Sequence, residues 1–158
     1  MAVDRKLVTR TLRGIAGEYF VAAELSRRGY VASLTLRNTK GIDILVSNQD
    51  ATKAAGIQVK TTLGTRARWI LTKKAEISPE SLAVNLFFVF VAIPEDGSLP
   101  SYHIVPRSIV AESVRRGHEE WLNTSPRFGQ RFDSSLRQFV DVEGKYKDNW
   151  SALGLDTP

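Results

Sequence analysis

Three polar side chains lie in two short segments that otherwise have the composition of buried β-strands. Residues 41–46 and residues 56–62 are mainly apolar and β-branched, and Gly, Asn and Asp border them. Because side chains alternate across a strand, Gln58 and Lys60 share one face, and Asp43 lies opposite the apolar side chains of its own strand. A carboxylate, an amide and an ammonium group at such positions require an explanation.

Asp43 and Lys60 allow two interpretations. A lysine inside a strand is costly to bury unless it is paired, so an ion pair between these two residues is the simpler structural interpretation. In the functional interpretation, the Asp43 carboxylate and the main-chain carbonyl of Val59 are hard oxygen ligands for Mg²⁺. Lys60 then lies near an attacking water and near the phosphate charge that grows in the transition state.

A predicted helix over residues 8–29 carries a fourth polar side chain of interest, Glu18. The predicted apolar stripe of this helix consists of Leu12, Ile15, Ala16, Tyr19, Ala22 and Ala23. Glu18 borders that stripe, so it either pairs with a cation such as Lys40 or supplies a second carboxylate to the metal, directly or through water. Gly14 and Gly17 each cost a helix about 1 kcal/mol relative to Ala, which predicts close approach of another backbone.

The remaining pattern predicts an α/β fold with a central mixed β-sheet flanked by helices. Further strands are expected at residues 30–36, 69–72, 86–93 and 102–105, and a further helix at residues 106–116. The two segments at residues 41–46 and 56–62 are expected to pair antiparallel through a turn. We expect a single domain over residues 1–158, with a core at about 11–116 and an irregular C-terminal extension that wraps around it at about 117–158.

Composition limits the function classes. The chain has 158 residues, of which 42% are hydrophobic and 25% charged, an ordinary globular balance. No apolar run approaches the roughly 18 residues of a membrane span, and no apolar signal-peptide core follows the N-terminus. The absence of cysteine fits a cytoplasmic location. A net charge of +5 favours polyanionic partners such as nucleic acid.

Several familiar catalytic patterns are missing from the sequence. His103 and His118 lie too far apart for a zinc signature, and we interpret both as structural. There is no Gly-x-Ser-x-Gly nucleophile motif, no Gly-x-Gly-x-x-Gly motif and no phosphate-loop lysine. Serine hydrolysis and the chemistry of dinucleotides and nucleoside triphosphates are therefore not expected.

The order of Glu18, then Gly41-Ile42-Asp43, then Gln58-Val59-Lys60 resembles the PD-(D/E)xK nuclease superfamily, whose fold is restriction-endonuclease-like. The resemblance covers roughly residues 11–93. Residues 17–30 also look like the first helix of the archaeal Holliday-junction resolvase type. The C-terminal region is similar to uncharacterised bacterial members.

The resemblance implies a set of site residues and a cofactor. It makes Asp43, Gln58, Lys60 and Glu18 the catalytic residues. It makes Asp43, Gln58, Glu18 and the Val59 carbonyl the ligands of Mg²⁺ or Mn²⁺. The sequence departs from the pattern at Gln58, where the superfamily usually has an acid, and no proline precedes Asp43. An amide oxygen still coordinates a metal, but the missing charge should weaken Mg²⁺ binding, and Glu18 would compensate for it.

Three hypotheses about function follow. The first is a metal-dependent endonuclease that hydrolyses DNA phosphodiester bonds, as a twofold homodimer if both strands of a duplex are cut. The second is a catalytically inactive nucleic-acid-binding module of the same fold, which Gln58 motivates. The third is a protein-interaction domain, such as an immunity factor. The basic residues expected to hold DNA phosphates are Arg37, Lys40, Arg66, Arg68, Arg127 and Arg131.

Overall fold

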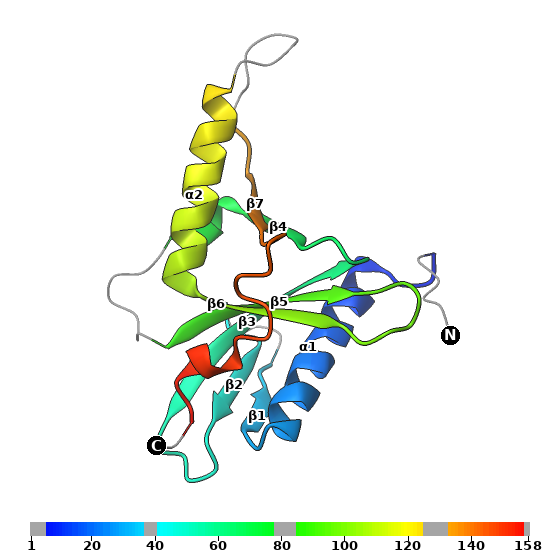
Figure 1. The fold of residues 1–158 in the computed structure, drawn as a ribbon, viewed down its shortest axis with the longest axis vertical. Helices are drawn as coiled ribbons and strands as arrows, with labels where there is room; N and C mark the ends of the chain where they lie inside the picture. Colours follow the sequence, from blue (N-terminus) through cyan, green and yellow to red (C-terminus); the bar gives the residue numbers. More distant parts are fainter. Residues whose placement is uncertain (1–5, 37–40, 78–84, 125–132, 157–158) are drawn as a thin grey trace.

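A five-stranded mixed sheet forms the centre of the protein. The computed structural model describes residues 6–36, 41–77, 85–124 and 133–156. The strands of the central sheet are β1 (Val31–Leu34), β2 (Ile44–Ser47), β3 (Ala54–Leu63), β5 (Leu86–Ile93) and β6 (Ser101–Pro106). They are ordered β1-β2-β3-β5-β6, and every neighbouring pair is antiparallel except β3 and β5, which are parallel (Figure 1). The expected antiparallel pairing of β2 with β3 is therefore confirmed.

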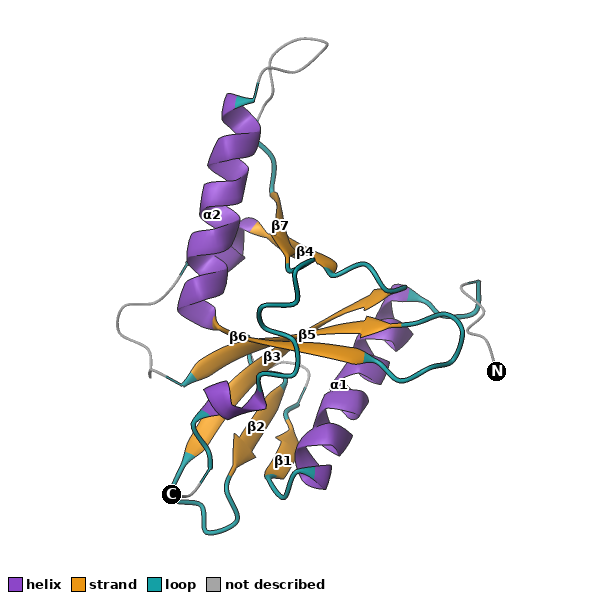
Figure 2. Ribbon diagram, in the orientation of Figure 1, coloured by secondary structure: helices purple, strands orange, loops and turns teal. Residues whose placement is uncertain are grey.

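The other elements cover the two faces of this sheet. They are α1 (Arg10–Arg27), β4 (Arg68–Thr72), the 3₁₀ turn η1 (Lys73–Glu76), α2 (Arg107–Asn123), β7 (Leu136–Val140) and the 3₁₀ turn η2 (Trp150–Leu153). Helix α1 lies on one side of the sheet, while α2 lies on the other with the two-stranded sheet of β4 and β7 (Figure 2). The predicted α/β class with flanking helices is confirmed. No helix within the described ranges has the length and apolar character needed to cross a membrane.

Strand β5 separates two hydrophobic cores. Its continuous apolar run predicts burial on both faces, and residues 87–93 are each at most 8% exposed. Val89 and Val91 pack on the side of α1, whereas Phe88 and Phe90 pack with β4, β7 and α2. Because successive side chains of a strand point to opposite faces, the valines of β5 pack in the core beside α1 and Phe88 and Phe90 pack in the core beside α2.

The buried face of α1 differs from the predicted stripe. Leu12 and Tyr19 are 53% and 61% exposed, and the buried positions are Gly17, Val21 and Leu25. A Cβ atom built on Gly17 would lie 1.9 Å from the Thr61 hydroxyl oxygen on β3. The helix therefore docks through its smallest residue, which counting apolar side chains could not reveal. The close neighbour is a side chain, not the backbone that we expected.

The chain after residue 116 is more regular than predicted. Helix α2 continues through Gly117 to Asn123. Strand β7 lies in a polar segment, where the alternation of buried and exposed side chains cannot be recognised from the sequence. The two inward residues of β7 are Phe139 and the arginine Arg137, which is 4% exposed. An ordinary strand pattern does not include a buried arginine, so β7 could not be recognised from hydrophobicity alone.

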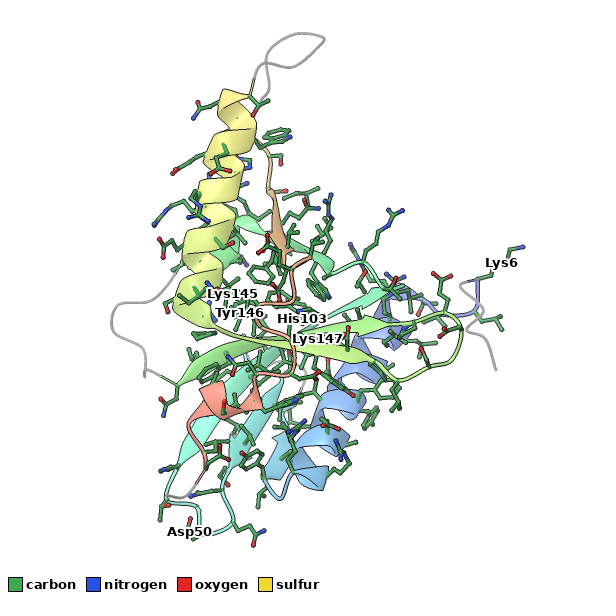
Figure 3. The ribbon with its side chains drawn as sticks, in the orientation of Figure 1. Lys6, Asp50, His103, Lys145, Tyr146 and Lys147 are labelled. Carbon is green, nitrogen blue, oxygen red and sulfur yellow. The ribbon has the colours of Figure 1, made fainter. Side chains whose placement is uncertain are left out.

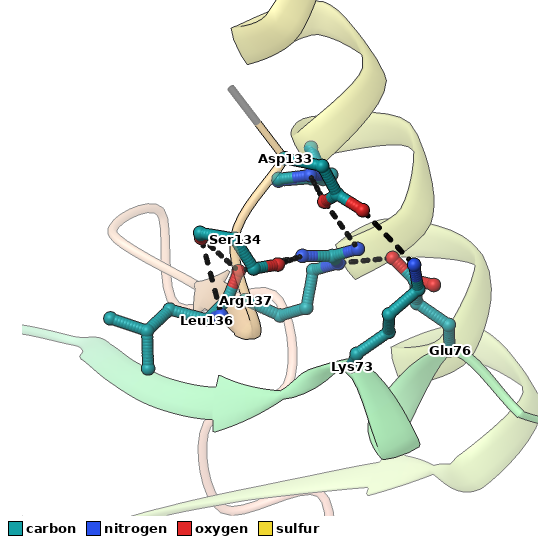
Figure 4. Close-up of polar contacts among 7 residues, drawn as sticks. Lys73, Glu76, Asp133, Ser134, Leu136 and Arg137 are labelled. Carbon is teal, nitrogen blue, oxygen red and sulfur yellow. Dashed lines mark hydrogen bonds and ion pairs between the residues drawn. The ribbon is translucent and has the colours of Figure 1, made fainter. Parts of the chain in front are cut away.

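A polar network joins α2, η1 and β7, and it explains how Arg137 is buried (Figure 4). Its guanidinium group donates to Glu76 and to the Ser134 carbonyl oxygen. Asp133 accepts from Lys73 at 3.0 Å and contacts His118 Nε2 at 2.7 Å. Every element that surrounds the arginine thus contributes an oxygen or a charge, which satisfies the buried donors.

His103 has a comparable structural role on β6. Its Nδ1 lies 2.6 Å from the Asp141 carboxylate, and both side chains are 4% exposed. Asp141 also accepts from the backbone N–H groups of Lys145 and Tyr146. The segment of Lys145, Tyr146 and Lys147 therefore lies beside His103 (Figure 3). The contact between His103 and Asp141 holds this C-terminal segment against the sheet.

Two glycines of α1 should respond oppositely to alanine. Gly17→Ala should destabilise the protein by about 1–3 kcal/mol, because the new methyl group overlaps Thr61. Gly14→Ala should stabilise it by about 1 kcal/mol, because no atom lies within 4 Å of that Cβ position and alanine favours the helix. Urea unfolding of both variants measures the difference. Equal effects of the two substitutions would contradict this docking of α1.

Asp133 should make stability depend on pH in the acid range. The hydrogen bond from Lys73, followed by that from His118, lowers the pKa of Asp133 to about 2. Because this pKa is depressed, its contribution is present above the unfolded pKa of about 3.9 and is lost as pH falls toward 2. The urea midpoint should therefore fall less between pH 6 and pH 3 in Asp133→Asn than in the wild type. Glu112→Gln, the same charge change on exposed α2, should keep the wild-type profile.

Candidate active site

Asp43 ends the pairing between β2 and β3. Its backbone N–H donates to the Ile57 carbonyl oxygen at 2.8 Å, and one residue later the ladder of β2 and β3 begins at Ile44. The Asp43 carboxylate oxygen Oδ2 accepts from the backbone N–H of Val59 at 2.7 Å. The side chain thus replaces the strand carbonyl that would otherwise bond to Val59, and it lies at the edge of β3.

The turn before β2 is tied to β1. The Asp43 carbonyl oxygen accepts from the Thr35 N–H at 2.9 Å, and the Thr35 hydroxyl donates to the Ile42 carbonyl oxygen at 2.6 Å. Gly41 has a φ of +76°, a left-handed conformation that glycine adopts at little cost. These bonds hold the backbone of Asp43, while the Val59 N–H holds its carboxylate.

The remaining oxygens at this position are the Asp43 oxygen Oδ1 and the Val59 carbonyl oxygen. The N–H and C=O of one strand residue point to the same neighbouring strand. The Val59 carbonyl is therefore on the same side of β3 as Asp43, beyond the point where β2 departs. Within the part of the chain that the structure describes, the Asp43 oxygen Oδ1 accepts no hydrogen bond.

Glu18 and Asp43 line a common cleft of about 260 Å³ between α1 and the end of β1. Thr35 and Leu36, which directly follow β1, form one wall of the cleft. Gly14 lies one helical turn before Glu18, and the open space at its Cβ position leaves room in the cleft. Two acidic residues from separate elements therefore line one cavity.

Gln58 and Lys60 lie on the opposite face of β3 from this cleft. They pair in register with Phe88 and Phe90 of β5, whose side chains belong to the core beside α2. Both side chains are half-buried. No ion pair joins Lys60 to Asp43 among the described residues, so the simpler structural interpretation finds no support. Neither residue lines the cleft of Glu18 and Asp43; the Asp43 carboxylate binds the backbone N–H of Val59, which lies between them in sequence.

The predicted basic residues fall into two groups. Arg66 and Arg68 are exposed and line an open groove of about 660 Å³ at the carboxyl ends of β3 and β5. Glu95 and Asp96 line the same groove, so its charge is mixed. The other predicted phosphate-binding residues lie outside the described residues, and they are Arg37, Lys40, Arg127 and Arg131.

One residue of the cleft was missed from the sequence. Arg10 lines the cleft with Gly14 and Glu18, and these positions are spaced by four residues along α1. Because residues four apart lie on one helix edge, extending the edge of Glu18 backwards by two turns identifies Arg10. A cation at this rim would attract an anionic ligand into the cleft.

The oxygens at this site fit a hard divalent cation. Asp43 offers a carboxylate of fixed orientation, Val59 a carbonyl oxygen, and Glu18 a second carboxylate across the cleft. Mg²⁺ is commonly held by one or two carboxylates and keeps several waters. No group of three or more His, Cys, Asp or Glu side chains is placed to hold a metal in the described ranges.

Two solved structures have a fold similar to that of this chain. A Holliday junction resolvase, Hjc of Archaeoglobus fulgidus, superposes with a TM-score of 0.52 and 11% identity, covering 92% of this chain and 98% of the resolvase. A bacterial homing endonuclease, I-Ssp6803I, superposes with a TM-score of 0.50 and 11% identity, covering 92% of this chain and 91% of the endonuclease. The chain has the restriction-endonuclease-like fold.

This fold is the one that the sequence resemblance implied. In this fold Asp43 directly precedes β2, the Gln58-Val59-Lys60 segment lies on the adjacent strand β3, and Glu18 lies on the helix packed beside them. No protein-family model and no curated protein matches the sequence. The resemblance is therefore carried by the fold and by these few positions.

Restoring an acid at Gln58 should strengthen metal binding. We expect Gln58→Glu to bind Mn²⁺ at least about tenfold more tightly, because opposite charges about 4 Å apart attract by several kcal/mol at an effective dielectric constant near 20. Isothermal titration calorimetry measures the affinity. Gln138→Glu, the same change at an exposed position of β7, is the control and should leave it unchanged. Equal Mn²⁺ affinities for the wild type, Gln58→Glu and Gln138→Glu would show that Gln58 is not a metal ligand.

Proposed function

We propose that this protein is a metal-dependent endonuclease that hydrolyses DNA phosphodiester bonds. The observation that carries the proposal is the Asp43 carboxylate, held by the Val59 N–H at the edge of β3 in a cleft shared with Glu18. The fold adds support, since the similar structures are a Holliday junction resolvase and a homing endonuclease.

In this proposal Mg²⁺ or Mn²⁺ is held by Asp43 and the Val59 carbonyl, with Glu18 from the cleft and Gln58 from the other face of β3 completing the site directly or through water. Such an ion acts as a Lewis acid toward a phosphoryl oxygen and lowers the pKa of a bound water. The hydrogen bond to Val59 fixes the Asp43 carboxylate in advance, so that no reorganisation is needed when substrate binds.

Lys60 has the complementary role in the proposed reaction. Its half-buried ammonium group follows Val59 by one residue and has no carboxylate partner among the described side chains. A positive charge in a partly desolvated site stabilises the negative charge that grows on the phosphate oxygens and orients the attacking water. The same charge also attracts the DNA backbone before reaction.

DNA is the proposed partner, and its backbone would be held mainly by arginines and lysines. Arg66 and Arg68 line the groove at the ends of β3 and β5, and the chain carries a net charge of +5. Phosphate contacts of this kind release counterions, so binding should weaken steeply with salt. We further propose a cytoplasmic protein that cuts both strands of a duplex as a homodimer.

Gln58 motivates a second candidate function. A catalytically inactive module of the same fold would keep Arg66 and Arg68 in their groove and bind DNA without a divalent ion. A protein-interaction domain, such as an immunity factor, would bind no DNA. The neutral amide among the proposed ligands is the observation that favours both over an active enzyme.

Cleavage of branched, nicked and linear DNA in the presence of Mg²⁺ or Mn²⁺ tests the proposed function. Asp43→Asn and Lys60→Met should each lower the rate by about 100-fold or more, the usual cost of removing one electrostatic contribution to a transition state. Asp50→Asn, at an exposed turn, should cleave like the wild type.

The outcomes separate the three functions. Cleavage that survives both Asp43→Asn and Lys60→Met would contradict the nuclease assignment. DNA binding without cleavage and without Mn²⁺ binding would identify the inactive module. The absence of salt-dependent DNA binding would identify the protein-interaction domain.

A further inference from the structure

Arg107 lies on the Gln58 side of the sheet. It is the first residue of α2 and directly follows β6. Its guanidinium carbon lies 5.9 Å from the centre of the Phe88 ring. Because Phe88 pairs in register with Gln58 on the adjacent parallel strand, the two side chains share a face and Arg107 lies over that face.

The guanidinium group also reaches the turn that carries Asp43. A Cβ atom built on Gly41 would lie 3.6 Å from the Nη1 atom of Arg107. Gly41 is two residues before Asp43 in the turn that β1 anchors. Arg107 therefore spans from the Asp43 turn to the face of Gln58 and Lys60, although 47 or more residues separate it from each of them in sequence.

The charge of Arg107 lacks a partner within the described chain. Its Nε atom is fully buried and makes no hydrogen bond, and no ion pair joins its guanidinium group to a described carboxylate. Its position is also unfavourable locally. The N-terminus of a helix carries partial positive charge, and the first turn of α2 contains no acidic residue to offset a cation there.

An anion is the ligand that would satisfy this arrangement. A guanidinium group presents five N–H donors in a planar fork that matches a phosphate group, and it stacks on aromatic faces. Phe88 provides the apolar surface beneath the guanidinium group, and Nη1 lies 3.6 Å from the position that a Cβ atom would take on Gly41. A partly desolvated, unpaired guanidinium group binds phosphate more strongly than a solvated one.

We propose that Arg107 binds a backbone phosphate of the nucleic acid beside the one that is cleaved. This inference rests on the proposed nuclease function and adds to it a phosphate-binding residue from α2, outside the strands and the helix that carry the metal site. In this arrangement Arg107 positions the strand across the Gln58 and Lys60 face without contributing to metal binding.

Three variants test the role of Arg107. In the absence of divalent metal, fluorescence anisotropy of a labelled DNA duplex over a series of salt concentrations gives both the affinity and its salt slope. Arg107→Gln should weaken binding about tenfold and reduce the slope by about one, as expected for the loss of one phosphate contact. Arg107→Lys should restore the slope but not the full affinity, because an ammonium group cannot bind bidentately.

Arg115→Gln is the matched control. It removes the same charge from an exposed position on the same helix, and it should alter the affinity less than twofold. Calorimetric Mn²⁺ affinity should be the same in the wild type, Arg107→Gln and Arg107→Lys, because Arg107 does not contact the metal. In cleavage assays Arg107→Gln should raise KM more than it lowers kcat.

The results distinguish this inference from the proposed function. If the wild type binds and cleaves DNA while Arg107→Gln behaves like Arg115→Gln, the role of Arg107 is wrong and the nuclease function stands. If the wild type binds no DNA, both are wrong. Should Arg107→Gln fail to fold, Arg107→Lys decides alone, and wild-type affinity in that variant would overturn bidentate phosphate binding.

Discussion

The hydrogen bond between the Asp43 carboxylate and the Val59 N–H is the interaction on which the candidate site depends. It ends the β2–β3 ladder by substituting a side-chain oxygen for a strand carbonyl. A buried backbone N–H needs an acceptor, so this substitution lets β2 depart without leaving Val59 unsatisfied. The same bond leaves the second carboxylate oxygen and the Val59 carbonyl on the side of β3 from which β2 departs, and Asp43 itself lines the cleft. One hydrogen bond therefore both terminates a strand and creates an oxygen-rich edge.

The rest of the fold supplies what this edge requires. Gly17 lets α1 approach Thr61 closely, and that approach places Glu18 across the cleft from Asp43. On the other face, the aromatic residues of β5 support α2 and the sheet of β4 and β7, and the His118–Asp133 contact joins the far part of α2 to the segment before β7. Arg107, the first residue of α2, belongs to that layer and lies over Phe88. Glu18 therefore approaches β3 from the α1 side, and Arg107 from the other.

Much of the sheet could be predicted because its signals are local. The apolar run of β5 and the turn between β2 and β3 follow from composition and strand geometry. The buried face of α1 could not be predicted, because it depends on Gly17 fitting Thr61 and not on apolar spacing. Strand β7 could not be predicted, because the burial of Arg137 depends on partners such as Glu76, which is distant in sequence. The placement of Asp43 and Gln58 on neighbouring elements could be predicted from the sequence, whereas Arg107 lies beside them only through the tertiary fold.

The central claim is that the edge of β3 beside Asp43 binds a divalent cation. The anomalous-difference map of a crystal soaked in Mn²⁺ tests it most directly, because Mn²⁺ scatters anomalously and accepts the oxygen ligands that Mg²⁺ prefers. We predict a peak about 2.1 Å from an Asp43 carboxylate oxygen and from the Val59 carbonyl oxygen, in the cleft that Glu18 lines. At saturating Mn²⁺, an empty cleft, or a peak only at the carboxylates of Glu95 and Asp96, would contradict the account.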